Sequence, residues 1–283
     1  MISTNTLMKT ALASFCCGAA LVAFSWGYQQ GTTTLELVAK DPNACLYVPG
    51  AGFSGFFYTI GHLQAASTLK EPTVSTRIVE PWKDNTDYYC FSAGCLATVA
   101  ALSNITVFDV HDTAFAIQDL WKSGEISQFQ VVEEFVDYLI AKGSEEGTLN
   151  AESLAKIHVI TSKVSPSKDS WLAAPKLDTI VRTPQNLEEL KETLLQTTWI
   201  PGATGDDWTL DGHLDGAFTS SNHPMCQSSV DLPKLSLTSW DSLEFYANIL
   251  LGVNMGQEQI ERFWSAGVKR GLQVTDVDTG AQP

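Results

Sequence analysis

Short apolar runs, each followed by a glycine-containing turn and a helix-like stretch, occur twice in the first part of the chain. Residues 45–48 precede a glycine loop and an apolar stretch over residues 56–69. Residues 88–91 precede a tight turn and a stretch of small apolar residues at 95–102. Strand, turn and helix in this order form the repeating unit of a parallel sheet. The pattern therefore predicts an α/β fold.

The later part of the chain alternates between helical and strand patterns. Apolar positions at helical spacing predict a helix over residues 126–141 with Gly143 as its C-cap, and β-branched alternation predicts a strand over residues 156–161. Thr183 and Pro184 fit the N-cap and first position of another helix, which continues through the leucines up to position 195. A loop rich in Gly and Asp and two closing helices are predicted at residues 201–216, 240–251 and 257–269.

The chain has no internal repeat and no linker rich in Pro, Gly or Ser, so residues 43–270 are predicted as one domain, followed by a polar tail at 271–283. Residues 10–26 carry no charge, and their length falls between a signal-peptide core and a comfortable membrane span. Three interpretations of residues 1–30 stay open: a removed signal peptide, a retained membrane anchor, or a buried helix of a soluble protein.

Charges around this segment predict on which side of a membrane the body of the chain lies. Lys9 and the amino group precede the segment and Lys40 follows it, which favours a cytoplasmic N-terminus. The signal and anchor interpretations then both predict a membrane-associated or secretory protein with its body on the lumenal or extracellular side. The sequon Asn104-Ile105-Thr106 gives this localisation weak support.

Composition narrows the function classes. The 17 Lys and Arg residues against 32 Asp and Glu residues give a net charge of −15, and no basic cluster exists, which argues against a nucleic-acid binder. None of the six cysteines forms a zinc-type pair, so no metal is expected. Cys90 and Cys95 are predicted to be reduced core residues.

The glycine loop between the first strand and helix supports two chemical interpretations. Backbone N–H groups at a helix N-terminus can cradle a dinucleotide pyrophosphate, or they can stabilise an oxyanion. Glu80, at the end of a strand-like run from Arg77, suits the ribose contact of the first interpretation. The loop consists of Gly50, Ala51, Gly52, Phe53, Ser54 and Gly55.

A second motif favours the oxyanion interpretation. Ser92 lies on a predicted strand-to-helix turn, where a serine hydroxyl is held up at the sheet edge as in a nucleophile elbow. The usual pattern has a glycine two positions earlier, where this chain has Cys90. A buried serine that only caps a helix would look similar. The elbow residues around the serine are Cys90, Phe91, Ala93 and Gly94.

No histidine lies in a recognisable base motif. The more informative candidates are the aspartates of two Asp-Gly turns, Asp211 and Asp215, whose carboxylates could reach another loop without steric obstruction. A lone Asp-Gly pair is often no more than a turn. The histidines are His62, His111, His158, His213 and His223.

Oxyanion glycines, an elbow serine and a late Asp-Gly-Ala, in this order, resemble the patatin-like phospholipase family, most closely its adipose triglyceride lipase branch. The glycine loop with its following helix and the run at residues 197–201 before Asp215 carry the likeness, which spans roughly residues 43–270. The chain departs from the family pattern at Ser54, where many members have Arg or Lys, and at Cys90.

The resemblance implies a three-layer α/β sandwich with a mostly parallel central sheet flanked by helices. It also implies a Ser-Asp dyad with Ser92 as nucleophile, Asp215 as base and the loop amides of residues 50–55 as oxyanion hole, without a catalytic histidine or a cofactor. The expected activity is hydrolysis of lipid carboxylic esters, acylglycerol or phospholipid, at a membrane or lipid-droplet surface. The alternative is a catalytically inactive patatin-like protein that binds lipid or serves as a scaffold.

Overall fold

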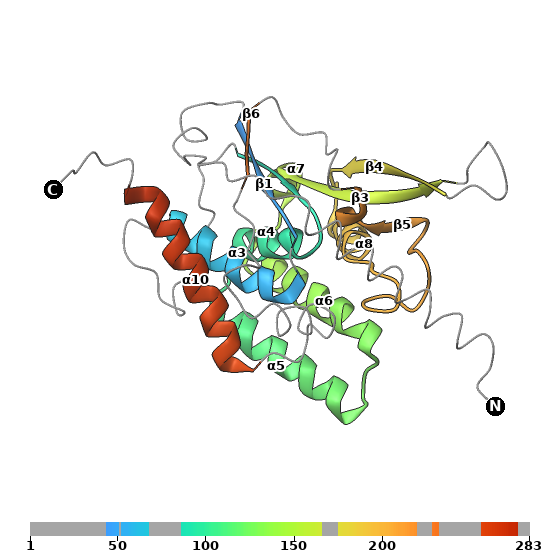
Figure 1. Ribbon diagram of the computed structural model, residues 1–283, viewed down its shortest axis with the longest axis horizontal. Coiled ribbons are helices and arrows are strands. Elements are labelled where there is room, and N and C mark those ends of the chain that lie inside the picture. Colours follow the sequence, from blue (N-terminus) through green and yellow to red (C-terminus); the bar gives the residue numbers. More distant parts are fainter. Residues whose placement is uncertain are drawn as a thin grey trace.

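The computed structural model describes residues 44–50, 52–67, 86–165, 175–219, 228–231 and 256–276. The segments 10–26, 77–80 and 240–251, for which the sequence predicts an apolar leader, a strand and a helix, lie outside these residues. The described part is an α/β structure in which a mixed, mostly parallel sheet is flanked by helices, as Figure 1 shows.

The sheet has the strand order β4-β3-β2-β1-β6, with β5 as an additional partner of β3. Strand β1 pairs in parallel with β2 and β6, and β2 pairs in parallel with β3, whereas β4 and β5 both run antiparallel to β3. The strands are β1 (Ala44–Val48), β2 (Asp87–Cys90), β3 (Ile157–Ser165), β4 (Lys176–Arg182), β5 (His213–Asp215) and β6 (Ser228–Asp231).

Helices connect the parallel strands and carry most of the core. Helix α4 lies at its centre, with every residue buried, and edge-on aromatic contacts join Phe56 on α3 to Phe57 and to Phe135 on α6. The helices are α3 (Gly52–Ser67), α4 (Ala93–Leu102), α5 (Val107–Ser123), α6 (Val131–Glu145), α7 (Ala151–Ala155), α8 (Leu187–Thr197) and α10 (Gln257–Asp276).

Helices α3 and α10 pack directly against each other and lie side by side in Figure 1. Two glycines permit the approach. A Cβ on Gly61 would lie 2.2 Å from the carbonyl oxygen of Trp264, and a Cβ on Gly267 would contact the carbonyl of Tyr58. Helix α10 therefore packs closely along α3, the helix that follows the glycine loop.

Several predicted boundaries were wrong. Helix α3 begins at Gly52 rather than residue 56, because the glycines read as loop are already helical. Helix α6 continues past Gly143 to Glu145, so Gly143 is not its C-cap. A Cβ on Gly143 would lie 2.4 Å from the Leu149 side chain, so the glycine allows Leu149 to pack closely against the helix. Asn186, not Thr183, caps α8 by accepting from the amide of Glu189.

Further elements were not predicted at all. Helix α5 has a complete capping box between Thr106 and Asp109, and its C-cap is Gly124 with φ 81°. Strands β4 and β6 were also missed, and β5 lies inside the predicted loop 201–216. Helix α10 continues to Asp276, six residues into the segment predicted as a polar tail.

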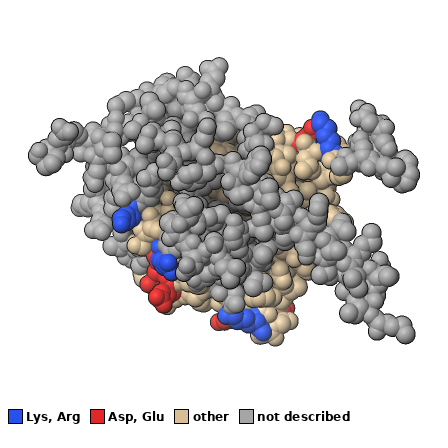
Figure 2. Space-filling model, in the orientation of Figure 1, with Lys and Arg blue, Asp and Glu red and all other residues tan. Residues whose placement is uncertain are grey.

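On the face drawn in Figure 2, the charged side chains of the described residues do not gather in one place. The Lys and Arg residues of the described part lie apart from one another there, some of them beside an acidic side chain. Ion pairs such as Lys191 with Asp137 and Glu133 join α8 to α6 on the exposed surface. Exposed pairs of this kind contribute little to stability.

Candidate active site

Ser92 lies in the turn between β2 and α4, where the sequence predicts an elbow. Its backbone has φ 53° and ψ −140°, a conformation that costs a residue with a Cβ roughly 1–3 kcal/mol. The amide of Gly94 donates to the carbonyl of Phe91 and the amide of Cys95 to that of Ser92, each at 3.0 Å. Helix α4 therefore starts directly at a sharp bend, and Ser92 lies buried at its tip.

Two glycines let this elbow pack on the loop after β1. A Cβ on Gly94 would lie 2.3 Å from the carbonyl oxygen of Val48, and a Cβ on Gly50 would lie 2.4 Å from the Cβ of Ser92. Neither position could carry a side chain unless the two loops moved apart. The backbone at Gly50 therefore lies directly against Ser92, and Ala93, the first residue of α4, is buried beside it.

The prediction of reduced cysteines beside the elbow was wrong. Cys90 and Cys95 form a disulfide with their Cα atoms 4.8 Å apart, and Cys45 is also disulfide-bonded. The bend at Ser92 turns α4 back over the end of β2, which brings the two cysteines within bonding range. Cys90 therefore cross-links the elbow in addition to occupying the place of its first glycine.

The loop predicted as an oxyanion hole is divided between a short loop and a helix. Gly52 has φ 65° and is the first residue of α3, so Phe53, Ser54 and Gly55 are helical. The N–H groups of a first helical turn have no acceptor within the helix. In the sequence, these N–H groups come shortly after Gly50, which contacts Ser92. Ala51 lies outside the described residues.

Strand β3 brings Asp215 to the elbow. Strand β2 pairs with β3 up to Cys90, which is opposite Val159, and β5 pairs further along β3 with Asp215 opposite Thr161. Because β4 occupies the other edge of β3, β2 and β5 share one edge and approach each other end to end. Ser92, two residues beyond Cys90, therefore arrives at the level of Asp215.

Asp215 has no solvent exposure. Its Oδ1 accepts a hydrogen bond from the amide of Ala217 at 2.8 Å, and its own amide donates to the carbonyl of Trp199 at 2.9 Å. Its Oδ2 is buried without a hydrogen-bond partner of ordinary length. Burial raises the pKa of Asp215 to about 7, while the nearby Ser92 hydroxyl and the Ala217 amide act in the opposite direction. The carboxyl group therefore changes protonation state near neutral pH.

Gly216, which follows Asp215, allows this segment to lie close to β3 and to the turn that contains Ser92. A Cβ on Gly216 would lie 2.5 Å from the carbonyl oxygen of Ile160 and 2.6 Å from the Cβ of Phe91. Asp211, the other aspartate of an Asp-Gly turn, is exposed and has a left-handed backbone with φ 52°. Of the two sequence candidates, the fold thus brings only Asp215 to Ser92.

The described histidines are engaged elsewhere. His213 hydrogen-bonds Thr161 at 2.9 Å, and its pKa is lowered, first by burial and then by nearby cations. His158 hydrogen-bonds Thr183 and stacks on Tyr89, with its ring centroid 4.4 Å away. His111 pairs with Asp112 on α5, His62 lies on α3 beside Tyr58, and His223 is outside the described residues.

Sequence reasoning missed two buried hydroxyl groups that contact the backbones of Ser92 and Asp215. The amide of Ser92 donates to Oγ1 of Thr197 at 2.9 Å, and Oγ of Ser162 donates to the carbonyl of Asp215 at 2.8 Å. A threonine at a helix end and a serine in a strand carry no signal of such long-range contacts. Only the pairing of β3 with its neighbours reveals them.

Among the described residues, no group of three or more His, Cys, Asp or Glu side chains is placed to hold a metal ion, and no helix has the length and apolar character of a membrane span. The chain matches no protein-family model, no curated protein and no solved structure.

Proposed function

We propose that the chain is a serine acyl hydrolase that cleaves carboxylic esters of lipids with Ser92 as nucleophile and Asp215 as base. The observation that carries the proposal is the pairing itself. A serine in a strained elbow lies close enough to a fully buried carboxyl group to lower its pKa, which burial raises to about 7. A base with a pKa near the working pH is best suited to take and return a proton.

In the first half of the reaction, Ser92 Oγ attacks the ester carbonyl carbon while its proton passes to Asp215 Oδ2. The carbonyl oxygen becomes an oxyanion. When the tetrahedral intermediate collapses, the bond to the alcohol breaks and the alcohol leaves with the proton from Asp215. The Ser92 hydroxyl lies near the Asp215 carboxyl group in the free protein, and catalytic contacts of this kind commonly tighten when substrate binds.

The second half removes the acyl group. A water molecule loses a proton to Asp215 as it attacks the acyl-Ser92 ester, and the proton returns to Ser92 Oγ when the fatty acid leaves. The Ser92 amide donates to Thr197, so the oxyanion is expected to take its donors from Gly50 and the first turn of α3. Gly50 lies directly against Ser92, and donors fixed before substrate arrives stabilise an oxyanion most effectively.

A lipid substrate is supported by the patatin-like order of motifs and by one feature of the surface. Trp208, with 53% of its surface exposed, lies in the segment between α8 and Asp215. Tryptophan suits the boundary between water and lipid because an apolar ring and a polar N–H are combined in one side chain. Its neighbours Asp206 and Asp207 disfavour contact with an anionic membrane, so a neutral lipid surface fits better.

The disulfides support a position in the secretory pathway or outside the cell. Such bonds persist in oxidising compartments and are rare in the cytosol. The Cys90–Cys95 bond thus agrees with the proposed lumenal or extracellular position of the domain.

The test is an assay of the purified full-length protein, in detergent, against triacylglycerol, phospholipid, galactolipid and lysolipid, with Ser92→Ala as the matched blank. Release of fatty acid by the unchanged protein and not by Ser92→Ala would support the proposal and identify the substrate class. A folded protein that binds these lipids without releasing fatty acid would favour the inactive lipid-binding alternative.

A further inference from the structure

Thr197, the last residue of α8, connects three distant parts of the chain through one buried hydroxyl group. Its Oγ1 lies 2.9 Å from the amide nitrogen of Ser92 and 2.6 Å from the carbonyl oxygen of Ile160 on β3. An amide can only donate and a carbonyl can only accept, so both roles are fixed. The Thr197 hydroxyl donates its single proton to Ile160 and accepts the Ser92 amide.

We propose that Thr197 is a positioning residue that holds the backbone of Ser92 in its strained conformation and so sets the direction of the Ser92 hydroxyl. This inference rests on the proposed hydrolase function. It goes beyond the dyad because Thr197 is not expected to contact substrate.

The strain at Ser92 explains why such support is needed. A left-handed φ persists only where surrounding contacts maintain it. In this turn the Ser92 amide lies outside the hydrogen bonds of both β2 and α4, and Thr197 satisfies it. Without the Thr197 hydroxyl, the buried Ser92 amide would lose its acceptor and the Ile160 carbonyl would lose this donor. Relaxation of the turn towards an ordinary conformation would then move the Ser92 side chain.

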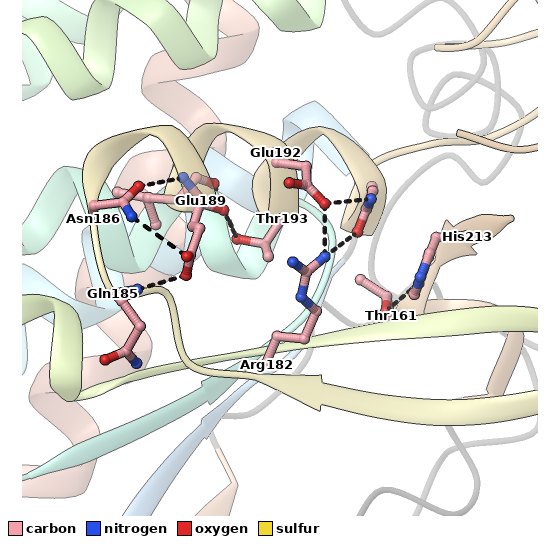
Figure 3. A network of polar contacts seen from close by, with 10 residues as sticks. Thr161, Arg182, Gln185, Asn186, Glu189, Glu192, Thr193 and His213 are labelled. Carbon is pink, nitrogen blue, oxygen red and sulfur yellow. Dashed lines mark hydrogen bonds and ion pairs between the residues drawn. The ribbon is translucent and has the colours of Figure 1, made fainter. Parts of the chain in front are cut away.

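Helix α8 itself is anchored at the level of Thr197. Arg182 on β4 donates to Glu192 and to Gln196, each at 2.9 Å, and Gln196 donates to Glu192 at 3.0 Å. Figure 3 shows Arg182 extending from β4 to this end of α8. The closed set of contacts fixes the residue immediately before Thr197 to the sheet.

The same frame also holds Asp215. Two residues after Ile160 on β3, Ser162 donates to the Asp215 carbonyl, and two residues after Thr197 the carbonyl of Trp199 accepts the Asp215 amide. A single stretch of β3 and the end of α8 therefore position both members of the dyad. Displacement of Thr197 is expected to change their relative geometry without changing their chemistry.

The experiment compares Thr197→Val, which keeps the shape and removes the hydroxyl, with Thr197→Ser, which restores it. Thr198→Val is the matched control, because Thr198 is also buried but its hydroxyl donates only within α8, to Leu194 at 2.7 Å and Leu195 at 3.2 Å. The readouts are kcat and KM for a soluble p-nitrophenyl ester, the rate of fluorophosphonate labelling at Ser92, and hydrogen exchange of the peptide that contains Ser92.

Thr197→Val is expected to lower kcat and the labelling rate about 10- to 100-fold with little change in KM, since small misplacements of a reacting group have effects of this order. Exchange in the Ser92 peptide should accelerate, Thr197→Ser should restore kcat to within about threefold of the unchanged protein, and Thr198→Val should keep it. If Thr197→Val does not fold, Thr197→Cys against Thr198→Cys gives the same comparison.

Two negative outcomes have different meanings. Unchanged kcat and labelling in Thr197→Val, in a protein that labels at Ser92, would overturn the role of Thr197 and leave the hydrolase proposal intact. Absence of labelling at Ser92 in the unchanged protein would overturn the hydrolase proposal itself, and the inference with it.

Discussion

The negative charge of Asp215 is unfavourable in the folded protein. Its carboxyl pKa is raised from 3.8 to about 7, mainly by burial. Below about pH 4 both folded and unfolded states bind the proton, so this group adds no pH dependence. Between about pH 4 and 7 only the unfolded state is ionised, and folding stability falls as pH rises. Above pH 7 the full loss, about 4 kcal/mol, is reached.

Asp215→Asn is therefore expected to remove hydrolysis and to increase the free energy of unfolding at pH 8 by up to about 4 kcal/mol, because a neutral amide replaces a buried charge. At pH 4 the two proteins should have similar stability. Urea unfolding at both pH values measures the difference. Asp211→Asn, an exposed control, should change neither activity nor stability. A destabilised or still active Asp215→Asn variant would contradict the assignment of the base.

The same pKa predicts the pH dependence of catalysis. Asp215 must be ionised to accept the Ser92 proton, so kcat/KM for a soluble ester should rise with pH and level off above about pH 7. The profile of the unchanged protein measures this pKa. A midpoint of the pH profile near 4 would indicate a hydrated carboxylate and would contradict a base that is buried at Asp215.

At the scale of single elements, the disulfide between β2 and α4 stabilises the elbow. Replacing both cysteines, as Cys90→Gly with Cys95→Ala, removes a cross-link that closes a short loop and should lower the free energy of unfolding by about 2 kcal/mol. Hydrolysis should stay within about tenfold, or 1.4 kcal/mol of barrier, since the glycine contacts and Thr197 still hold Ser92. Denaturant unfolding and an ester assay measure both effects. Complete loss of activity in a folded variant would give the disulfide a catalytic role.

The contact between the glycine loop and the elbow gives a sharper test. Gly50→Ala places a Cβ at 2.4 Å from that of Ser92, so the loop must move and its amides with it. Losing one oxyanion donor costs about 10²–10³ in rate, and kcat should fall by that order. Gly256→Ala is the control, because nothing lies within 4 Å of its Cβ. Equal kcat values in the two variants would argue against an oxyanion hole at Gly50.

Some elements could be predicted from the sequence because their apolar pattern lies within a single segment of the chain. Strands β1, β2 and β3 and helix α4 are apolar segments bounded by turns, so their pattern is visible without tertiary contacts. Strand β5 has three residues and exists because β3 offers it an edge. Helix α5 did have readable signals, the Thr106–Asp109 capping box and Gly124, and was nevertheless missed.

For the candidate site, the sequence predicted the Ser92 turn and Asp215 but not what holds them. The Cys90–Cys95 bond depends on the sharp bend at Ser92, and the raised pKa of Asp215 depends on complete burial. Both are properties of the folded chain. Motif spacing alone contains neither.

For the whole molecule, the proposed lumenal or extracellular position of the domain predicts a glycan on Asn104. Asn104 lies in the turn between α4 and α5, partly exposed and with φ 55°. Expressed in a eukaryotic host, the protein should shift in electrophoresis after glycosidase treatment, and Asn104→Gln should not. The domain should also resist protease in intact vesicles. An accessible, unshifted domain would place it in the cytosol; a protected domain without a shift would exclude only the glycan.

Covalent labelling shows whether Ser92 is a nucleophile that Asp215 activates. The full-length protein is treated with a fluorophosphonate at pH 8, and the modified peptide is identified by mass spectrometry. We expect one adduct, on Ser92. It should be absent in Ser92→Ala and form much more slowly in Asp215→Asn, whereas Asp211→Asn should label at the normal rate. A folded protein that gains no adduct, or gains one on another serine, would contradict the assignment of Ser92 as the nucleophile.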